Sequence, residues 1–533
     1  MTRPAGAVLS TGPRPRGTGI VVSPHHQASR AGVEILESGG NAVDAAIAVD
    51  AVLGVVLPDT CGPGGDLFAL VHRPGMDAPA TLNASGRAGS GMAADDLRDL
   101  DLGEIPLRSP WSITVPGCVD GWHALAETFG SLPLASVLAP AIAIARDGFP
   151  ASVELIQSLE RLHPMIADQP SAGAFYPQGA LLRDGDRITR VDLARTLEDI
   201  ATSGREGFYT GPVASGIMAA AEGAITQDDL DQVQADWIDA VSLEVLGRTG
   251  WTIPPNSQGY LTLATLWIFE HLDPPSDPND ALYQHLLIEA YRSVAWERAD
   301  TVSDPDTAVM GVEELLSTDR LGSRANRIRP DRTTRWPMPE PSLGGTSYMT
   351  VLDGDGMGVS LIQSNFAGIG SGRSAGATGV WLHNRGAGFN LLPGHPNEYA
   401  PHKRPLHTLS PTLWTSGPDL SLLLGTRGGD HQPQYLAQLA AHHLHANLCT
   451  DDSQLAPRWN MAQPMPGTDS AIRVESRMAM TTIQGLRDRG HVVDIAGSYE
   501  TGWGPISAID VIGEHKGSAD PRISTSSALT SSM

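Results

Sequence analysis

A threonine that follows two glycines and begins a strand is the feature that most constrains this chain. Gly344-Gly345-Thr346 ends a stretch, residues 327–345, that is rich in proline and arginine and lacks apolar periodicity, which is typical of an exposed linker. The residues after Thr346 alternate and turn at Asp355-Gly356, which predicts a β-hairpin. A small nucleophile between a linker and a strand indicates a chain that is cut before Thr346. The freed α-amine would then serve as general base for the threonine hydroxyl.

Composition narrows the range of partners. The chain has 533 residues, and its 36 Lys+Arg against 60 Asp+Glu give a net charge of −24. Because acidic surfaces repel nucleic acid and anionic membranes, we expect neither as a partner. The three cysteines, Cys61, Cys118 and Cys449, form no metal or disulfide motif, and we expect no metal or other cofactor. The sequence shows no secretory h-region and no apolar stretch long enough to cross a bilayer, so a cytoplasmic location is the default expectation.

Hydrophobic periodicity divides the chain into a helix-rich first part and a strand-rich second part. Helices are expected at about 27–36, 41–57, 120–148, much of 190–245, 280–300, 432–448 and 479–489. Strands are expected at 19–23, 67–72, 346–352, 357–364, 378–383 and 420–425. This order of elements predicts a layered α+β architecture.

Several motifs occur along the chain in a fixed order. They are Gly39-Gly-Asn-Ala-Val-Asp-Ala-Ala46, Gly64-Gly65-Asp66, Val115-Pro-Gly117, Gly345-Thr346, Lys403-Arg-Pro-Leu406, Leu409-Ser-Pro-Thr412 and Gly428-Gly429. Together they resemble the γ-glutamyltransferase family of N-terminal nucleophile hydrolases, over about residues 18–510. Asn384-Arg-Gly-Ala-Gly-Phe389 and Pro393-Gly-His-Pro-Asn397 look most like the shorter, glutathione-hydrolase-like bacterial members.

The resemblance implies a fold and a maturation step. The family fold is a four-layer αββα sandwich made from one precursor that cuts itself before the nucleophilic threonine. In this chain the products would be a large subunit, 1–345, and a small subunit, 346–533, which stay associated.

The resemblance also implies which residues perform the chemistry. The Thr346 hydroxyl would attack the Gly345 carbonyl during maturation and an amide carbonyl of the substrate afterwards. Gly428-Gly429 would offer backbone N–H groups to the developing oxyanion. Ser364, eighteen residues after Thr346, would orient the nucleophile, with Asn365 as a plausible neighbour.

Substrate recognition departs from the family pattern. His407 and Thr408 stand where many transferases have a serine pair, and both are candidate substrate-binding residues. The acid that binds the donor α-amino group is missing, since Gly388 stands there. The arginine that grips the donor carboxylate aligns with Ser85, so Arg87 and Arg385 are the candidate guanidiniums.

Two further features shape the expected activity. Only five residues separate Asn397 from Lys403, where many family transferases carry a longer lid. An open rim exposes an acyl-enzyme to water, so hydrolysis should outrun transfer. We expect hydrolysis of γ-glutamyl amides such as glutathione. Two alternatives stay open: an acylase for glutaryl or other dicarboxylic acyl amides, as in the family's cephalosporin acylases, and an unprocessed homologue without catalysis.

Overall fold

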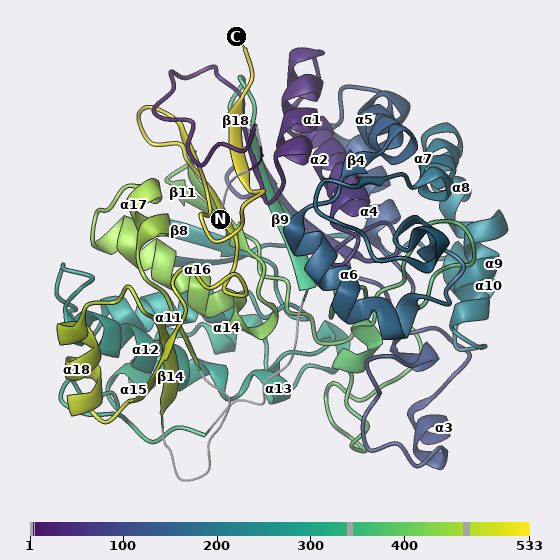
Figure 1. Ribbon diagram of the computed structural model, residues 1–533. Coiled ribbons are helices and arrows are strands. Elements are labelled where there is room, and N and C mark those ends of the chain that lie inside the picture. Colours follow the sequence, from purple (N-terminus) through teal and green to yellow (C-terminus); the bar gives the residue numbers. More distant parts are fainter. Residues whose placement is uncertain (1–3, 5, 338–344, 462–469, 533) are drawn as a thin grey trace.

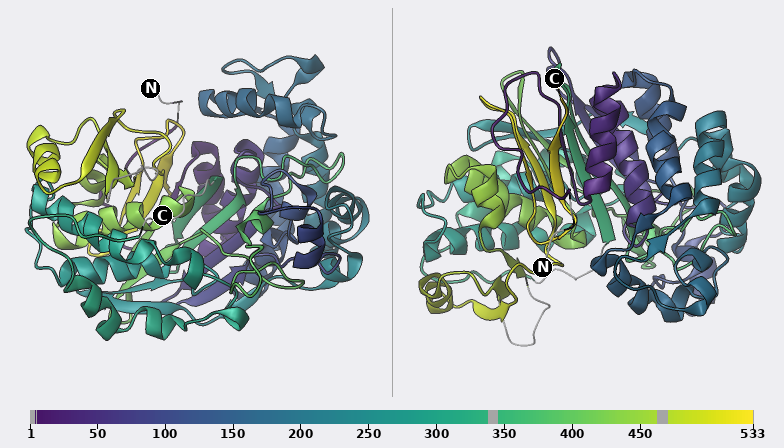
Figure 2. Two further views of the ribbon diagram at one scale, coloured as in Figure 1. Left: turned by 90° about the horizontal axis from the view of Figure 1, so that it is seen from below. Right: turned by 45° about the horizontal axis from the view of Figure 1, so that its top comes forward.

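Two facing β-sheets form the centre of the computed structural model, which describes residues 4, 6–337, 345–461 and 470–532. Helices cover the outer face of each sheet, so the layers run helix, sheet, sheet, helix (Figure 1, Figure 2). Separate sets of buried apolar side chains fill the contact between the sheets and the contact of each sheet with its helices. The expected αββα sandwich of the α+β class is therefore confirmed.

The first sheet combines strands from both sides of Thr346, in the order β18-β1-β9-β10-β2-β3-β6. Its strands are β1 (Ile20–Ser23), β2 (Asp66–His72), β3 (Ala80–Ala84), β6 (Asp236–Ile238), β9 (Gly345–Leu352), β10 (Gly358–Phe366) and β18 (Ser527–Thr530). β9 and β10 form the expected hairpin and lie between β1 and β2. The Asp353 carboxylate closes the turn by accepting the N–H groups of Asp355 and Met357.

The second sheet has the order β17-β16-β12-β11-β8-β7. Its strands are β7 (Val241–Val245), β8 (Arg248–Thr252), β11 (Thr412–Ser416), β12 (Asp419–Thr426), β16 (Ile506–Asp510) and β17 (Lys516–Ala519). The sheets approach closely at Gly425, where an added Cβ would lie 2.1 Å from the ring of Tyr348. This contact brings the end of β12 to the start of β9.

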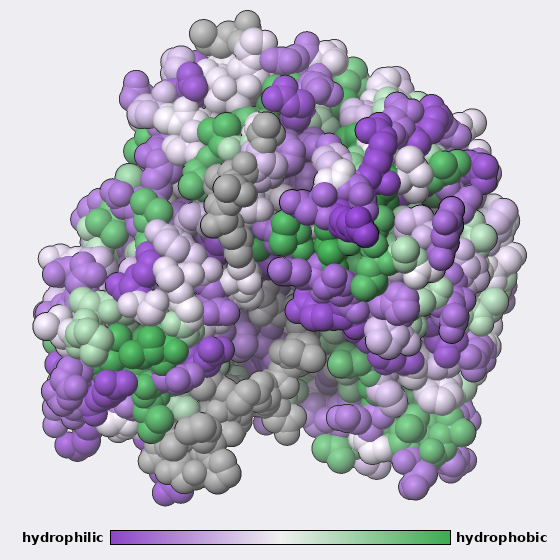
Figure 3. All heavy atoms as spheres, in the orientation of Figure 1, coloured by the Kyte–Doolittle hydropathy of each residue, from purple (hydrophilic) through white to green (hydrophobic). Residues whose placement is uncertain are grey.

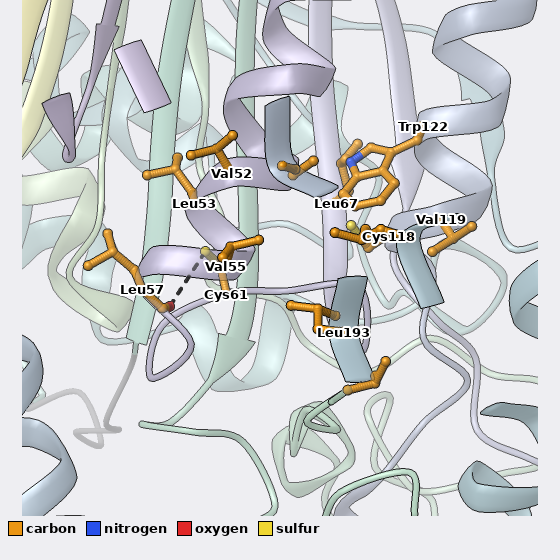
Figure 4. Close-up of a cluster of buried hydrophobic side chains, with 14 of the residues drawn as sticks. Val52, Leu53, Val55, Leu57, Cys61, Leu67, Cys118, Val119, Trp122 and Leu193 are labelled. Atoms are coloured by element: carbon orange, nitrogen blue, oxygen red, sulfur yellow. Dashed lines mark hydrogen bonds between the residues drawn. The ribbon is translucent and has the colours of Figure 1, made fainter. Parts of the chain in front are cut away.

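The helices that cover the first sheet are α1 (His26–Glu37), α2 (Ala42–Val56), α4 (Cys118–Phe129), α5 (Leu134–Asp147) and α7 (Val191–Ser203). α2 is buried along its whole length, as its nearly uncharged sequence predicts. Asn41 caps it in a capping box with Asp44, which satisfies N–H groups at the helix start. Figure 4 shows part of this core, with Val52, Cys118 and Trp122 in one cluster.

The helices that cover the second sheet are α11 (Tyr260–Glu270), α12 (Ala281–Ala295), α15 (Thr318–Ala325), α16 (Gln432–Ala440) and α18 (Met480–Asp488). α16 continues into a π-helical turn, Ala441–His445. The remaining α-helices are α3 (Ala94–Asp99), α6 (Val153–Ile166), α8 (Glu206–Tyr209), α9 (Gly211–Ala220), α10 (Gln227–Asp231), α13 (Arg298–Thr301), α14 (Val312–Leu315) and α17 (Thr450–Leu455). Two small sheets contain β4 (Phe149–Pro150) with β5 (Arg187–Ile188), and β13 (Trp459–Met461) with β14 (Ala471–Glu475) and β15 (Val492–Ala496).

Two secondary-structure expectations are wrong. Helix was expected through much of 190–245, but it ends with α10, and β6 and β7 follow because each pairs with a neighbouring strand. Residues 378–383 form no strand and make only an isolated bridge between Trp381 and Ser374. Tertiary pairing, which local periodicity does not contain, decides both cases.

The expected linker is anchored over its described part. Ile328 and Trp336 are buried, and the Thr334 N–H donates to the Glu289 carboxylate. Residues 327–337 are therefore not a free linker, because α12 and the apolar core behind it hold them. The rest of the expected linker, 338–344, lies outside the described residues.

The face seen in Figure 3 is mostly hydrophilic, with apolar residues in separate patches. Within the ranges described, none of the helices combines the length and the apolar character needed to cross a bilayer. Apolar burial is thus concentrated between the layers.

Candidate active site

Thr346 lies at the start of β9 and is 1% exposed. Its hydroxyl donates to Ser364 Oγ at 3.2 Å, and the Ser364 hydroxyl donates to the carbonyl oxygen of Gly345 at 2.5 Å. The pairing of β9 with β10 shifts register between Gln363 and Phe366, and the Phe366 N–H donates to Ser364 Oγ at 2.8 Å. Ser364, expected near Thr346, therefore contacts both sides of the 345–346 peptide bond.

Asn365 places a side-chain amide that has no described hydrogen-bond partner beside Thr346 and Ser364. Its backbone N–H donates to the Thr60 carbonyl at 3.0 Å, but its buried side-chain nitrogen and oxygen have no partner among the described residues. Gly65 permits this packing, because a Cβ there would lie 2.6 Å from Asn365 Oδ1. The side chain can thus accept from, or donate to, a group that arrives at Thr346.

Gly428 and Gly429 follow β12 and take φ values of 135° and 56°, which glycine adopts readily. A Cβ on Gly428 would lie 2.9 Å from the ring of Tyr435. In the described part of the chain, no acceptor is bound to the N–H of either glycine. These N–H groups are therefore available to a developing oxyanion.

Gln258 ties the glycine loop to the segment that contains Thr408. Its Nε2 donates to the carbonyls of Thr408 at 2.9 Å and Gly429 at 3.0 Å. Its Oε1 accepts from Arg298 Nη1 at 3.2 Å, and Arg298 forms a buried ion pair with Asp430. No local pattern distinguishes Gln258, Arg298 and Asp430 from other polar residues, so they could not be predicted from the sequence.

A cleft of about 730 Å³ opens beside these elements. Its walls include Phe366, Arg385, Gly388 and Thr408 among mostly apolar residues. Arg385 is 1% exposed and its guanidinium lies 3.8 Å over the Phe366 ring. Nη2 donates to Thr408 Oγ1 at 3.3 Å, whereas Nε and Nη1 have no partner in the described structure.

Burial lowers the pKa of Arg385 to about 9, so the guanidinium is still charged at neutral pH. A buried cation with two free N–H groups is a receptor for a carboxylate. The one carboxylate among the described lining residues is that of exposed Glu104. The sequence predicted no acid at position 388, and the described lining of the cleft interior likewise offers no buried carboxylate.

The expectation for His407 needs correction. Its side chain is fully buried, with Nε2 2.9 Å from Asp66 Oδ2, and Nδ1 accepts from the Leu409 N–H at 3.3 Å. Burial lowers the pKa of His407 to about 3, so the ring is neutral and Nε2–H donates to Asp66. Both ring nitrogens are used inside the protein, and His407 is a structural residue, whereas Thr408 lines the cleft.

Arg87 has a partner of its own outside the cleft wall. Its Nη2 lies 2.6 Å from Asp236, which also pairs with Arg404, and Arg87 is not part of the cleft wall. Ser85 is buried and bonds Asn83. Asp236 draws Arg87 away from the position that the sequence suggested.

The rim of the cleft carries no long lid at residues 398–402. Glu398 pairs with Arg98, the Tyr399 N–H donates to Asn390, and the His402 N–H donates to Ala88. These contacts hold the short connection against the body of the protein. The short connection is therefore part of the protein body, and the open rim stays a prediction.

An αββα sandwich that presents a threonine at the start of a central strand defines the class of N-terminal nucleophile hydrolases. Within that class, the model of the gamma-glutamyltranspeptidase family matches residues 28–530, and the chain belongs to this family. It is thus an enzyme of the hydrolase and acyltransferase type, related to self-processing glutathione hydrolases.

Similar proteins are named for different activities. The glutathione hydrolase-like YwrD proenzyme of Bacillus subtilis is 37% identical over 511 residues, which cover 94% of this chain and 97% of that protein. The oxamate amidohydrolase proenzyme of Klebsiella pneumoniae is 33% identical, with 95% and 97% covered. The structure of cephalosporin acylase from Bacillus halodurans matches with a TM-score of 0.90 at 31% identity, covering 99% of this chain and 97% of that one.

Proposed function

We propose that this protein hydrolyses amides whose acyl group ends in a carboxylate, through an acyl ester on Thr346. The observation that carries the proposal is Arg385, a buried guanidinium with two unpartnered N–H groups in the wall of the cleft. Two of the relatives are named for glutathione and for oxamate. Each of these compounds carries a carboxylate on the acyl side of an amide. Arg385 supplies the matching cation.

Maturation begins at the peptide bond before Thr346. The Thr346 oxygen bonds to the Gly345 carbonyl carbon, the C–N bond breaks, and the α-amine leaves with the proton, which produces an ester. Water then hydrolyses the ester and leaves a Gly345 carboxylate and a free Thr346 α-amine. The contact of Ser364 with the Gly345 carbonyl oxygen supports this step, because it polarises the bond under attack.

Turnover repeats the same chemistry on a substrate amide. The α-amine takes the hydroxyl proton, the Thr346 oxygen attacks, and Gly428 and Gly429 stabilise the oxyanion. The amine product leaves with the proton, and water releases the acid. Asn365 can hold the α-amine, since its amide has no other described partner. The open rim predicted from the sequence admits water and favours hydrolysis over transfer.

The cleft selects for a carboxylate but not for an α-amino group. No described acid inside it could bind an ammonium, since Glu104 is exposed. We therefore propose that γ-glutamyl and glutaryl amides are both substrates. The γ-glutamyl hydrolase expected from the sequence and its alternative, an acylase for dicarboxylic acyl amides, would then be one enzyme. The intact contact of Thr346 with Ser364 favours both over a homologue without catalysis.

The test compares γ-glutamyl, glutaryl and butyryl p-nitroanilides, which differ in charge but share a leaving group. We expect kcat/KM for the first two to agree within about tenfold, and to exceed that for butyryl by about 100-fold, because charged hydrogen bonds contribute about 1.5–3 kcal/mol. Efficient turnover of the butyryl compound would contradict the role of Arg385. Turnover of the γ-glutamyl compound alone would show that an α-amine site exists after all.

Intact-mass analysis tests the nucleophile separately. Mature protein should consist of 1–345 and 346–533, and N-terminal sequencing should read Thr-Ser-Tyr-Met. Thr346→Ser should still be processed, and Thr346→Ala should remain one chain. A Thr346→Ala protein that is cut and active would exclude the proposed mechanism.

A further inference from the structure

A second cavity, of about 250 Å³, lies where α12 faces α17 and α18, among the helices that cover the second sheet (Figure 1). Pro278 and Gln284 contribute to its wall from the chain before Gly345, and His442, Leu455 and Met478 contribute from the chain after it. None of its lining residues belongs to the active-site cleft. A molecule bound here would therefore contact both sides of the proposed cleavage point without touching the catalytic residues.

Two buried polar side chains of this wall have nitrogen or oxygen atoms without a hydrogen-bond partner in the described structure. His442 is 3% exposed, and neither ring nitrogen has a hydrogen bond among the described residues. Gln284 is also 3% exposed; its Nε2 donates to the Pro278 carbonyl at 2.7 Å, but its Oε1 accepts nothing in the described structure. Unsatisfied polar atoms inside a protein are rare and costly. Their presence in one cavity indicates a site that a ligand completes.

The local backbone is consistent with a functional site. His442 lies in the π-helical turn Ala441–His445, which extends α16. Turns of this type are rare and are often found at functional positions. The extended turn is what places this histidine in the cavity wall.

The charges around the cavity define the ligand class. Burial, together with Arg458 and Arg522, lowers the pKa of His442 to about 4, so at neutral pH the ring offers one N–H donor and one acceptor. Arg458 and Arg522 lie outside the cavity wall and are paired with Asp520 and Glu475, but their effect on the His442 ring still disfavours a cation bound against that ring. Exposed Asp452 in the wall disfavours an anion. A neutral ligand avoids both penalties.

We propose that this cavity binds a small uncharged molecule that carries a primary carboxamide on an apolar body. The amide oxygen accepts from the His442 N–H, and an amide N–H donates to Gln284 Oε1. The apolar body packs against Leu448, Leu455 and Met478, which line the same cavity. The proposal does not depend on the reaction at Thr346.

Benzamide, benzoate and benzylammonium form a matched set of probes with one neutral, one anionic and one cationic group. We expect saturable binding of benzamide to the mature wild-type protein by ligand-observed NMR, with a Kd of about 1 mM for a ligand of this size. Benzoate and benzylammonium should bind at least about tenfold more weakly. No saturable binding of benzamide, or equal binding of all three, would overturn the proposal.

Variants locate the binding. His442→Leu should weaken benzamide binding at least about tenfold and leave kcat/KM on the anilides unchanged. His443→Leu is the matched control, because the ring of His443 bonds the Leu448 carbonyl at 2.8 Å and is not part of the cavity wall. If His442→Leu does not fold, Gln284→Leu should show the same loss. Benzamide affinity that survives substitution of the cavity residues would place the ligand elsewhere.

Discussion

Arg385 is a guanidinium that the fold removes from water without a described ion pair of its own. Its described contacts are the Phe366 ring and the hydroxyl of Thr408, neither of which neutralises a charge. Two nearby carboxylates favour its charge, but both are already bonded to other side chains: Asp66 to His407 and Asp430 to Arg298. Burying an unpaired cation costs stability, so a substrate carboxylate is the group that this arrangement lacks.

Replacing this residue separates binding from folding. Arg385→Met should lower kcat/KM for γ-glutamyl and glutaryl anilides by about 10–100-fold, while Tm stays equal or rises because an unpaired buried charge is removed. Steady-state kinetics and thermal unfolding of the mature protein measure both effects. Arg87→Met is the control, since Arg87 pairs with Asp236 outside the cleft wall, and it should keep wild-type kcat/KM. An equal loss on the butyryl anilide would argue against carboxylate recognition.

The short segment between β8 and α11 links the glycine loop at 428–429 to the segment at 408–409. Ser257 Oγ donates to the Leu409 carbonyl at 2.6 Å, and Gln258 reaches the carbonyls of Thr408 and Gly429. The oxyanion glycines are therefore held by a segment far away in the sequence. A rigid support of this kind is what an oxyanion site requires, because donors must be aimed before the charge develops.

Gln258→Met keeps the side-chain length and removes these bonds. We expect kcat to fall by about tenfold or more, with KM nearly unchanged, because a misaimed donor weakens the transition state rather than the bound substrate. Gln438→Met is a matched control: Gln438 is buried, and its Nε2 also donates to two carbonyls, those of Gln434 and Trp459. Similar kcat losses in both variants would mean that the effect is structural.

α2 carries a carboxyl group inside the first helix–sheet core. Asp50 accepts from Trp122 Nε1 at 2.7 Å, while its Oδ1 has no partner in the described part of the chain. Burial raises the pKa of Asp50 to about 7. Between its ordinary pKa and about 7 the folded state binds more protons than the unfolded state, so this group makes stability fall as pH rises through that window.

Asp50→Asn should therefore change the pH dependence of stability. The variant keeps an acceptor for Trp122 but cannot ionise, so its advantage over wild type should grow between about pH 5 and pH 8, up to a few kcal/mol. Denaturant unfolding at both pH values measures the change. Asp44→Asn on the same helix is the comparison, since that buried side chain caps the start of the helix through the Asn41 N–H. A pH-independent difference would show that Asp50 does not titrate in this range.

At the scale of the molecule, the proposed cleavage point lies inside a shared sheet. β9 and β10, from the chain after Gly345, sit between β1 and β2 from the chain before it, and β18 pairs with β1. Cutting one peptide bond removes none of these strand pairs. The chain segments before and after Gly345 are consequently one folding unit rather than two docked domains.

Mature protein should therefore behave as one cooperative body. We expect 1–345 and 346–533 to elute together in native buffer and to unfold in a single transition, with a Tm within a few degrees of that of uncut Thr346→Ala. Size exclusion, denaturing electrophoresis and calorimetry test this. Separate elution of the two pieces without denaturant would contradict it.

Local patterns in the sequence identified only those site residues that have a local signal. Thr346 begins an alternating hairpin, Ser364 ends its return strand and Gly428-Gly429 follows a strand, and the family motifs that these residues match implied their roles. Gln258, Arg298 and Asp430 are ordinary polar residues that folding brings together from distant segments. For the same reason the sequence predicted substrate contacts for Arg87 and His407, although Arg87 pairs with Asp236 and His407 bonds Asp66.

Periodicity, turns and side-chain identity are local properties, so the sequence by itself determined the layered α+β class and the hairpin that presents Thr346. Its resemblance to the family implied the αββα sandwich and the absence of an acid at Gly388. The tertiary structure alone decided which polar groups are already paired. Burial and partner geometry set the free energy of each charge, and both depend on contacts between segments hundreds of residues apart. That is why Arg385, and not Arg87, remains available to a substrate.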